Sequence, residues 1–290
     1  MKKYLGMLGL LIVTIIWGGG FVASDIALQS LHPAQILTIR FFLASILIFP
    51  FCLGSMKTVT KEEMKAGIFL GIFLFGAFAL QTIGLQYTTP AKNAFLTATN
   101  VVFVPFIARV LYKKKVGIQS IIGACMAIVG AGVLSLEKNF TIGQGDSLTL
   151  LGAICFALQI FFTGEYVTKY RVIILMFFQM VTACILSSVY LLGSCGMADL
   201  VLTRDGILSV VYLGVISTTL TYLIQTVSQQ YVDETKSAII LSMEAVFGCL
   251  FSVWILHETI HAKMIVGCIL ILGAVLVSEI KIRHKRSENK

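Results

Sequence analysis

The sequence predicts an all-α polytopic membrane protein: ten transmembrane helices as two inverted five-helix repeats, with both termini cytoplasmic. Three observations predict this fold class. Of the 290 residues, 58% are hydrophobic and 12% are charged, whereas soluble domains carry about 25% charged residues. Apolar runs of about 20 residues, the length that a helix needs to cross a bilayer, recur along the chain. Finally, two distant stretches of the chain repeat each other.

The apolar runs leave room only for short connections and for no soluble domain. Lipid offers the backbone no hydrogen-bond partner, so each run must be a helix. The first run resembles a signal peptide in its charged start, but its length and the equal division of spans favour a retained helix. The predicted spans are residues 4–23, 34–53, 66–86, 94–112, 117–136, 147–166, 172–192, 207–229, 237–256 and 262–280.

The repeated stretches are residues 81–94 and 225–238, which agree at six of fourteen positions without a gap. The same offset of 144 residues pairs Gly123 with Gly267. A repeat of this kind indicates an internal duplication. The predicted units are a first repeat, a second repeat and a basic tail, at residues 1–140, 145–285 and 286–290.

The lysines and arginines predict the orientation. With the N-terminus in the cytoplasm, sixteen of those outside the spans lie on the cytoplasmic side and four on the other side, a bias typical of membrane proteins. This bias explains the formal charge of +8 without a nucleic-acid partner. Because each repeat has an odd number of spans, the two repeats are inverted, as in transporters whose central site opens to either side in turn.

Inversion places the two copies of the motif on opposite faces of the membrane. We therefore expect one copy to form an outer gate and the other an inner gate. The outer candidates are Gln81, Thr82, Gln86 and Tyr87, and the inner candidates are Gln225, Thr226, Gln230 and Tyr231. The alternative is that these side chains mark helix ends at the membrane interface, where amphipathic residues collect.

The offset of 144 also pairs Asn100 with Glu244, and both lie within about 5 Å of the predicted midplane. An acidic residue at a helix centre costs about 2.5–3.5 kcal/mol on insertion scales, so it indicates function by default. Glu244 would bind an ammonium group, carry a coupling proton, or stay neutral as a structural acid. Thr97 shares the helix face of Asn100.

Arg40 is a second charge inside a span. A guanidinium stays charged and needs a partner in lipid. Two readings remain open. Arg40 pairs with Glu244 and is structural, or it lines the cavity and holds a substrate carboxylate.

Three glycines after Trp17 predict a bend in the first span, as in the discontinuous helices of transporters. Pro105 predicts a kink in the fourth span beside Asn100. Gly123, Ala127 and Ala131 form a ridge of small residues, which suits either a homodimer face or packing within the chain.

These residues resemble the EamA domain of the drug/metabolite transporter superfamily over nearly the whole chain. The resemblance rests on Trp17-Gly18-Gly19-Gly20-Phe21, Arg40-Phe41, Gly84-Leu85-Gln86-Tyr87-Thr88 running on to Ala94, and Glu244 followed by a helix that ends at Glu258. It implies a ten-helix, exporter-like bundle around a central cavity, with amino acids, other small metabolites or amphiphilic drugs as substrates. The departures are Ala245 where the family usually has proline, Asn100 opposite Glu244, and Phe156-Ala157 where tryptophan is frequent.

The expected function is therefore secondary transport, more specifically export of a small organic solute across the plasma membrane. The alternatives are an importer or a non-transporting sensor with the same fold. We expect no enzyme, cofactor or metal site, because the histidines are scattered and His257-Glu258-x-x-His261 lacks the remaining ligand of a zincin helix. Lipid, a small-molecule substrate and coupling protons are the expected partners. The candidate substrate or coupling residues are Glu244, Asn100, Arg40, Thr97 and Trp17.

Overall fold

The computed structural model describes residues 2–113, 117–135, 142–194, 201, 203–259 and 261–279, and every regular element in these ranges is a helix. The predicted basic tail at 286–290 lies outside them. In chain order the helices are α1 (Lys2–Leu28), α2 (Pro33–Met56), α3 (Lys61–Leu85), α4 (Pro90–Thr97), α5 (Asn100–Tyr112), α6 (Ile118–Ser135), α7 (Gln144–Tyr166), α8 (Val172–Ser194), α9 (Arg204–Val211), the π-helix η1 (Tyr212–Leu220), α10 (Thr221–Ser228), α11 (Glu234–Ser242), α12 (Glu244–Leu256) and α13 (Ala262–Glu279).

We call a rod any single helix, or run of consecutive helices, that together corresponds to one predicted span. Each predicted span falls on one rod. Three rods consist of more than one element: α4 with α5, α9 with η1 and α10, and α11 with α12. Within the described ranges, eight rods are long and apolar enough to cross a membrane, and α6 and α13 contain shorter apolar stretches. Length and composition therefore support a multi-pass membrane protein.

Local sequence fixes where the early helices begin. At the start of α2, the His32 side chain accepts a hydrogen bond from the backbone, while the Gln35 side chain accepts from the His32 N–H. Thr60 and Glu63 make the same reciprocal pair at the start of α3. Such capping boxes satisfy backbone donors that the helix itself leaves free.

The duplication is visible in the helix boundaries. α5 and α12 begin and end at residues offset by 144, and so do α6 and α13. Lys113 and His257, which end α5 and α12, have left-handed φ angles of 54° and 53° and differ by the same offset. Thr89 and Asp233, again 144 apart, cap α4 and α11. Corresponding parts of the two sequence repeats thus have the same local structure.

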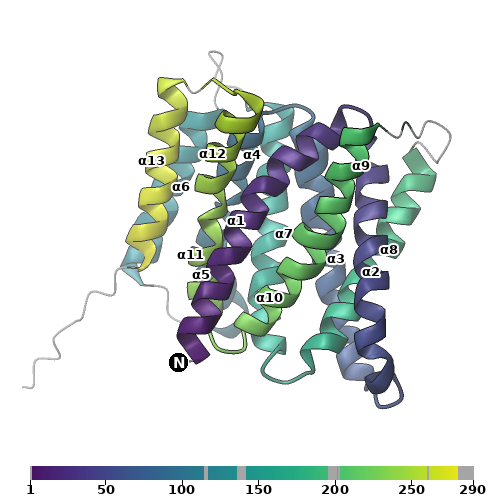
Figure 1. Cartoon of the computed structure of the whole chain (residues 1–290). Coiled ribbons are helices and arrows are strands. Elements are labelled where there is room, and N and C mark those ends of the chain that lie inside the picture. Colours follow the sequence, from purple (N-terminus) through teal and green to yellow (C-terminus); the bar gives the residue numbers. More distant parts are fainter. Residues whose placement is uncertain are drawn as a thin grey trace, which may run out of the picture.

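Contacts between the rods are reciprocal. α6 packs along α13 and α2 packs along α8, and Figure 1 shows these pairs on opposite flanks of the bundle. α3 packs on α7 and α8, just as the α9–η1–α10 rod packs on α1 and α2. Exchanging the two repeats therefore maps these contacts onto one another, as a two-fold relation requires.

The breaks in the fourth and ninth rods lie at Ala98–Thr99 and at Met243. There the backbone bonds close shorter turns, from Thr99 N to Leu96 O at 3.2 Å and from Met243 N to Ile240 O at 3.1 Å. The break of the fourth rod thus lies before Asn100, whereas α5 continues through Pro105. The kink predicted at Pro105 stays a prediction.

The glycines after Trp17 do not interrupt α1, which is continuous from Lys2 to Leu28. They bring helices close together instead. A Cβ at Gly18 would lie 2.5 Å from Phe247 Cβ and 2.8 Å from Gly248 N of α12. These glycines therefore serve a close helix crossing, and the predicted bend stays a prediction.

The ridge of small residues on α6 packs within the chain. Ala127 and Ala131 are buried, and a Cβ at Gly130 would lie 2.8 Å from a side-chain carbon of Ile271 on α13. Because α13 covers this face, the ridge is not free for a second copy of the chain.

Gly18→Ala is expected to lower the apparent melting temperature of the purified protein by several degrees. The added methyl group overpacks the α1–α12 crossing, which costs about 1–3 kcal/mol, more than the helix propensity gained. The measurement is a thermal melt followed by size-exclusion chromatography in detergent. Gly54→Ala is the matched control, since no atom lies within 4 Å of a Cβ at Gly54; equal melting temperatures for the two variants would contradict the prediction.

Candidate functional site

A cavity lies between the two repeats at the centre of the bundle. α1, α2, α3, α5, α7, η1 and α12 all contribute to its wall. Its free volume is about 30 Å³, which is room for one or two water molecules. The lining residues are Trp17, Gly20, Phe21, Ser24, Arg40, Phe78, Gln81, Asn100, Phe156, Ile160, Ser217 and Glu244. Four of the five predicted substrate or coupling residues thus share one cavity. The fifth, Thr97, does not line it but is hydrogen-bonded to Gln81, which does.

Arg40 reaches the cavity from α2 and is 3% exposed. Its Nε donates a hydrogen bond to the Thr218 hydroxyl of η1, and its guanidinium carbon lies 3.7 Å from the centre of the Phe78 ring. The negative face of the ring attracts a cation. These two contacts hold the guanidinium in place without neutralising its charge.

Glu244 is the first residue of α12 and is 5% exposed. Within the described part of the chain, its carboxylate makes no ion pair and no hydrogen bond. As the first residue of α12 it lies at the end of the helix where the helix dipole favours a negative charge. The structure thus contains no Arg40–Glu244 ion pair, although both residues line the same cavity.

Asn100 is the first residue of α5, at the position that corresponds to Glu244 in the other repeat. Its Oδ1 is buried without a hydrogen-bond partner, and so are the hydroxyl oxygens of Ser217 and Tyr222. Buried polar atoms are normally paired with protein or water. Unused polar atoms around a cavity indicate that water or a ligand completes them.

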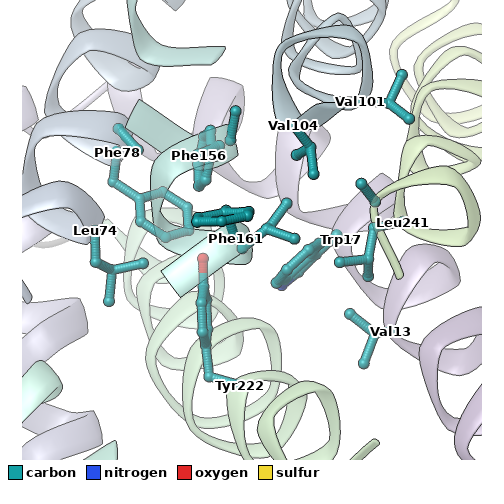
Figure 2. Packing of buried hydrophobic residues seen from close by; sticks show 14 of the residues in the cluster. Val13, Trp17, Leu74, Phe78, Val101, Val104, Phe156, Phe161, Tyr222 and Leu241 are labelled. Carbon is teal, nitrogen blue, oxygen red and sulfur yellow. The ribbon is translucent and has the colours of Figure 1, made fainter. Parts of the chain in front are cut away.

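Trp17, Phe21, Phe78 and Phe156 form much of the remaining wall. Figure 2 shows Trp17, Phe78 and Phe156 among the buried hydrophobic residues, together with Tyr222. The Trp17 ring lies 5.2 Å from the Tyr222 ring, and the Phe78 ring lies 5.1 Å from that of Phe156, measured between centroids. Trp17 Nε1 donates to Ser217 O at 3.0 Å. A wall of this kind suits an apolar group of a ligand.

Sequence reasoning missed Phe78, Tyr222 and Ser217. The first two carried a signal, because they correspond to each other at the offset of 144 and their rings lie 6.1 Å apart. Apolar pairs of this kind are common in helices, however, and only the structure shows that Phe78 lines the cavity and that Tyr222 packs behind it.

The outer gate candidates divide into buried and exposed residues. Gln81 lines the cavity, and its Nε2 donates to Thr97 Oγ1 at 3.0 Å. Thr82 is buried next to it. By contrast, Gln86 is exposed and Tyr87 is 59% exposed, as expected for side chains that mark a helix end.

The inner copy divides in the same way. Gln225 is buried and its Nε2 donates to Gln229 Oε1 at 3.2 Å, and Thr226 donates to Tyr222 O at 2.6 Å. Gln230 and Tyr231 are exposed. Gln225 is not among the cavity-lining residues, unlike Gln81, so the cavity extends toward one motif copy and not the other.

No metal site is found in the described ranges, where no three His, Cys, Asp or Glu side chains come together. Glu258, the acid of the His257-Glu258-x-x-His261 stretch, is used structurally. Its Oε2 accepts hydrogen bonds from the Ser252 hydroxyl and from Ala91 N at 3.3 Å, so it ties α12 to the start of α4.

Comparison with known proteins gives one family and one fold. A family model described as the EamA-like transporter family matches residues 4–136 and again residues 143–279. An uncharacterized transporter of Archaeoglobus fulgidus is 32% identical over 282 residues, covering 97% of this chain and 88% of the relative. The uncharacterized transporter YoaV of Bacillus subtilis is 21% identical, covering 94% and 96%. A solved crystal structure with 15% identity has a TM-score of 0.70 over 94% of this chain and 97% of its own.

Glu244→Gln is expected to raise the apparent melting temperature by a few degrees. The substitution keeps the side-chain shape and removes a buried charge without a partner, whose desolvation destabilises the fold. The measurement is a thermal melt in detergent at pH 8. Glu258→Gln is the control and is expected to lower the melting temperature, because that carboxylate has two partners. A loss of stability in Glu244→Gln would show that its carboxylate is satisfied in the native protein.

Proposed function

The chain belongs to the EamA-like transporter family, and from this premise we propose that it is a secondary transporter that exports a small metabolite, an amino acid or a close relative, across the plasma membrane. Transport proceeds by alternating access between the two repeats. The single observation that carries the substrate proposal is that Arg40 and Glu244 line one cavity and are not paired with each other.

Two unpaired opposite charges in one cavity suit a zwitterion. A carboxylate placed on Arg40 completes the guanidinium, whose fork of N–H donors matches a carboxylate. An ammonium group placed on Glu244 neutralises a carboxylate that otherwise lacks a partner. An α-amino acid brings both groups on adjacent atoms, and the aromatic wall of Trp17, Phe78 and Phe156 accommodates its side chain.

The arrangement of the rods supports the inverted-repeat mechanism. α4 contacts α12 and α5 contacts α11, so the corresponding broken rods run in opposite directions. Figure 1 shows α4 beside α12 toward one end of the bundle and α5 beside α11 toward the other. The start of α1 and the end of α13 lie at the same end, as two inverted five-span repeats require.

The size of the cavity indicates which conformation of the transporter the structure represents. A free volume of about 30 Å³ is far below the roughly 300–1,000 Å³ of ordinary ligand pockets. The structure is therefore a contracted form, and the rods must separate for a solute to enter. The gate candidates Gln81, which is half-buried, and Gln225, which is buried, lie on α3 and α10, in the corresponding rods of the two repeats.

An α-amino acid is expected to raise the melting temperature of the purified protein, whereas analogues with only one of its two charged groups raise it less. A ligand that binds the folded state stabilises it more, the higher its concentration is relative to its dissociation constant. The screen uses the protein amino acids. The analogues of leucine are 3-methylbutylamine, which lacks the carboxylate, and 2-hydroxy-4-methylpentanoate, which lacks the ammonium group.

Substitutions of Arg40 and Glu244 test separately the recognition of the carboxylate and of the ammonium group. Arg40→Gln is expected to abolish the preference for leucine over the amine, and Glu244→Gln the preference for leucine over the hydroxy acid. If amines alone or acids alone stabilise the parent protein as well as the amino acid does, zwitterion recognition is wrong.

Proton coupling gives a separate prediction for Glu244. In proteoliposomes with an acidic lumen, accumulation of radiolabelled substrate is expected in the parent protein. Glu244→Gln is expected to lose this accumulation. Its counterflow is expected to persist when the substrate concentration is raised to offset the weaker binding of the ammonium group, since exchange of substrate for substrate needs no proton. Glu258→Gln, the matched control, should keep the response to the gradient. Gradient-driven accumulation in Glu244→Gln would assign the proton to another group.

A further inference from the structure

The π-helix η1 (Tyr212–Leu220) lies where the eighth rod borders the cavity. π-helical segments are rare and often mark functional sites. The corresponding third rod, α3, is α-helical throughout Lys61–Leu85. The difference between these two rods is therefore specific to the second repeat.

One additional residue explains the π-helix. Before it, the two rods correspond at an offset of 143: Thr60 and Thr203 are their N-caps, and Gly71 corresponds to Gly214. After it, the offset is 144, as Gln81 and Gln225 show. The eighth rod thus contains one residue more than the third between these points.

Packing fixes both sides of the insertion. A Cβ at Gly214 would lie 3.3 Å from Arg40 O on α2, and one at Gly71 would lie 2.7 Å from Gln179 O on α8. On the other side, the Tyr222 ring packs on Trp17.

The spacing explains why the turn must widen. Gly71 and Phe78 are seven residues apart, close to two turns of α-helix at 3.6 residues per turn. Gly214 and Tyr222 are eight residues apart. The wider π turns keep both residues on one face.

The π-helix places Ser217 at the cavity and the Thr218 hydroxyl against Arg40, where the first repeat has Leu74 and Phe75 at the offset of 143. Thr218 accepts the hydrogen bond from Arg40 Nε, and Ser217 O accepts that from Trp17 Nε1. Gln179, whose backbone corresponds to that of Arg40, has no such partner, and its Nε2 is buried without a hydrogen bond. The π-helix thus supplies the anchor of the arginine side chain.

We infer that Thr218 is a positioning residue: by holding Arg40 Nε against the π-helix, it keeps the guanidinium over the Phe78 ring and directs its remaining N–H groups to a substrate carboxylate. This inference rests on the proposed function for the identity of the ligand. The geometry of the hydrogen bond between Arg40 Nε and Thr218 does not depend on the proposed function. An arginine without this bond is free to rotate about its long side chain, which lowers its affinity for a carboxylate.

The test compares Thr218→Val, which removes the hydroxyl and keeps the shape, with Thr218→Ser, which retains the hydroxyl. Thr219→Val is the matched control, because the Thr219 hydroxyl donates to Gly214 O of its own helix at 2.8 Å. The ligands are leucine, 2-hydroxy-4-methylpentanoate and 3-methylbutylamine. A second measurement needs no ligand: the Arg40 Nε–Hε signal in protein labelled with ¹⁵N-arginine, identified by its absence in Arg40→Lys.

Thr218→Val is expected to weaken binding of leucine and of the hydroxy acid about tenfold, the effect of one hydrogen bond to a charged group, and to leave the amine unchanged. Thr218→Ser should restore both affinities. The Arg40 Nε–Hε signal should exchange with water faster in Thr218→Val alone.

Two results distinguish a failure of the positioning role of Thr218 from a failure of the zwitterion proposal. An Arg40 signal and an acid affinity in Thr218→Val equal to those in Thr219→Val would overturn the positioning role. If none of the three ligands binds the parent protein, the zwitterion proposal fails, and the Arg40 signal still decides whether Thr218 holds the arginine.

Discussion

The two ionisable side chains at the centre of the bundle, Arg40 and Glu244, are the constraint on which the rest of the structure depends. Each is nearly fully buried, and a buried ion without a partner costs several kcal/mol even after relaxation. The surrounding elements reduce this cost. Phe78 and Thr218 hold the guanidinium, and the break at Met243 makes Glu244 the first residue of a helix, where the helix dipole favours a carboxylate. A direct ion pair would be more stable, so leaving the charges apart favours binding over stability.

The duplication makes such departures easy to recognise. Most corresponding positions have corresponding structure, down to the left-handed residues that end α5 and α12. The chemistry lies where the repeats differ: a neutral amide at position 100 against an acid at 244, and apolar Leu74 and Phe75 against the hydroxyl groups of η1. A symmetric scaffold lets two halves exchange conformations, whereas a single bound solute lacks that symmetry and needs different groups on its two sides.

Much of the fold could be predicted from the sequence because long apolar runs have one stable form in lipid. Each predicted span falls on one rod, and the offset of 144 reappears in the helix boundaries. The bends could not be predicted as well. The break before Asn100 lies in Ala98–Thr99, without the expected proline, and its counterpart at Met243 has no proline either. Neither break carries a local sequence signal that would have placed it.

The site shows the same division. Burial cost alone identified Glu244 and Arg40, because a charged residue in an apolar run is visible without a structure. The aromatic wall was missed because Phe78 and Tyr222 look like ordinary core residues. The π-helix was missed for a different reason: the repeat was aligned at one offset, and the additional residue appears only when the two ends of the rod are compared. Insertions within a duplicated helix are therefore worth examining before the structure is known.

The contracted cavity and the broken rods are related, because the cavity must widen to admit a solute and the breaks allow the rods to bend. A cavity that holds one or two waters must widen to take up a solute, and continuous helices packed at close crossings resist bending. The breaks at Ala98–Thr99 and Met243 lie directly before Asn100 and Glu244, at the level of the cavity. Each rod can therefore change direction there with little loss of backbone hydrogen bonding, since its two halves already end and begin at that point. A ligand that contacts both Arg40 and Glu244 would pull on α2 and on the start of α12 at once. Because the start of α12 lies next to the break at Met243, binding energy applied there can change the arrangement of the helices.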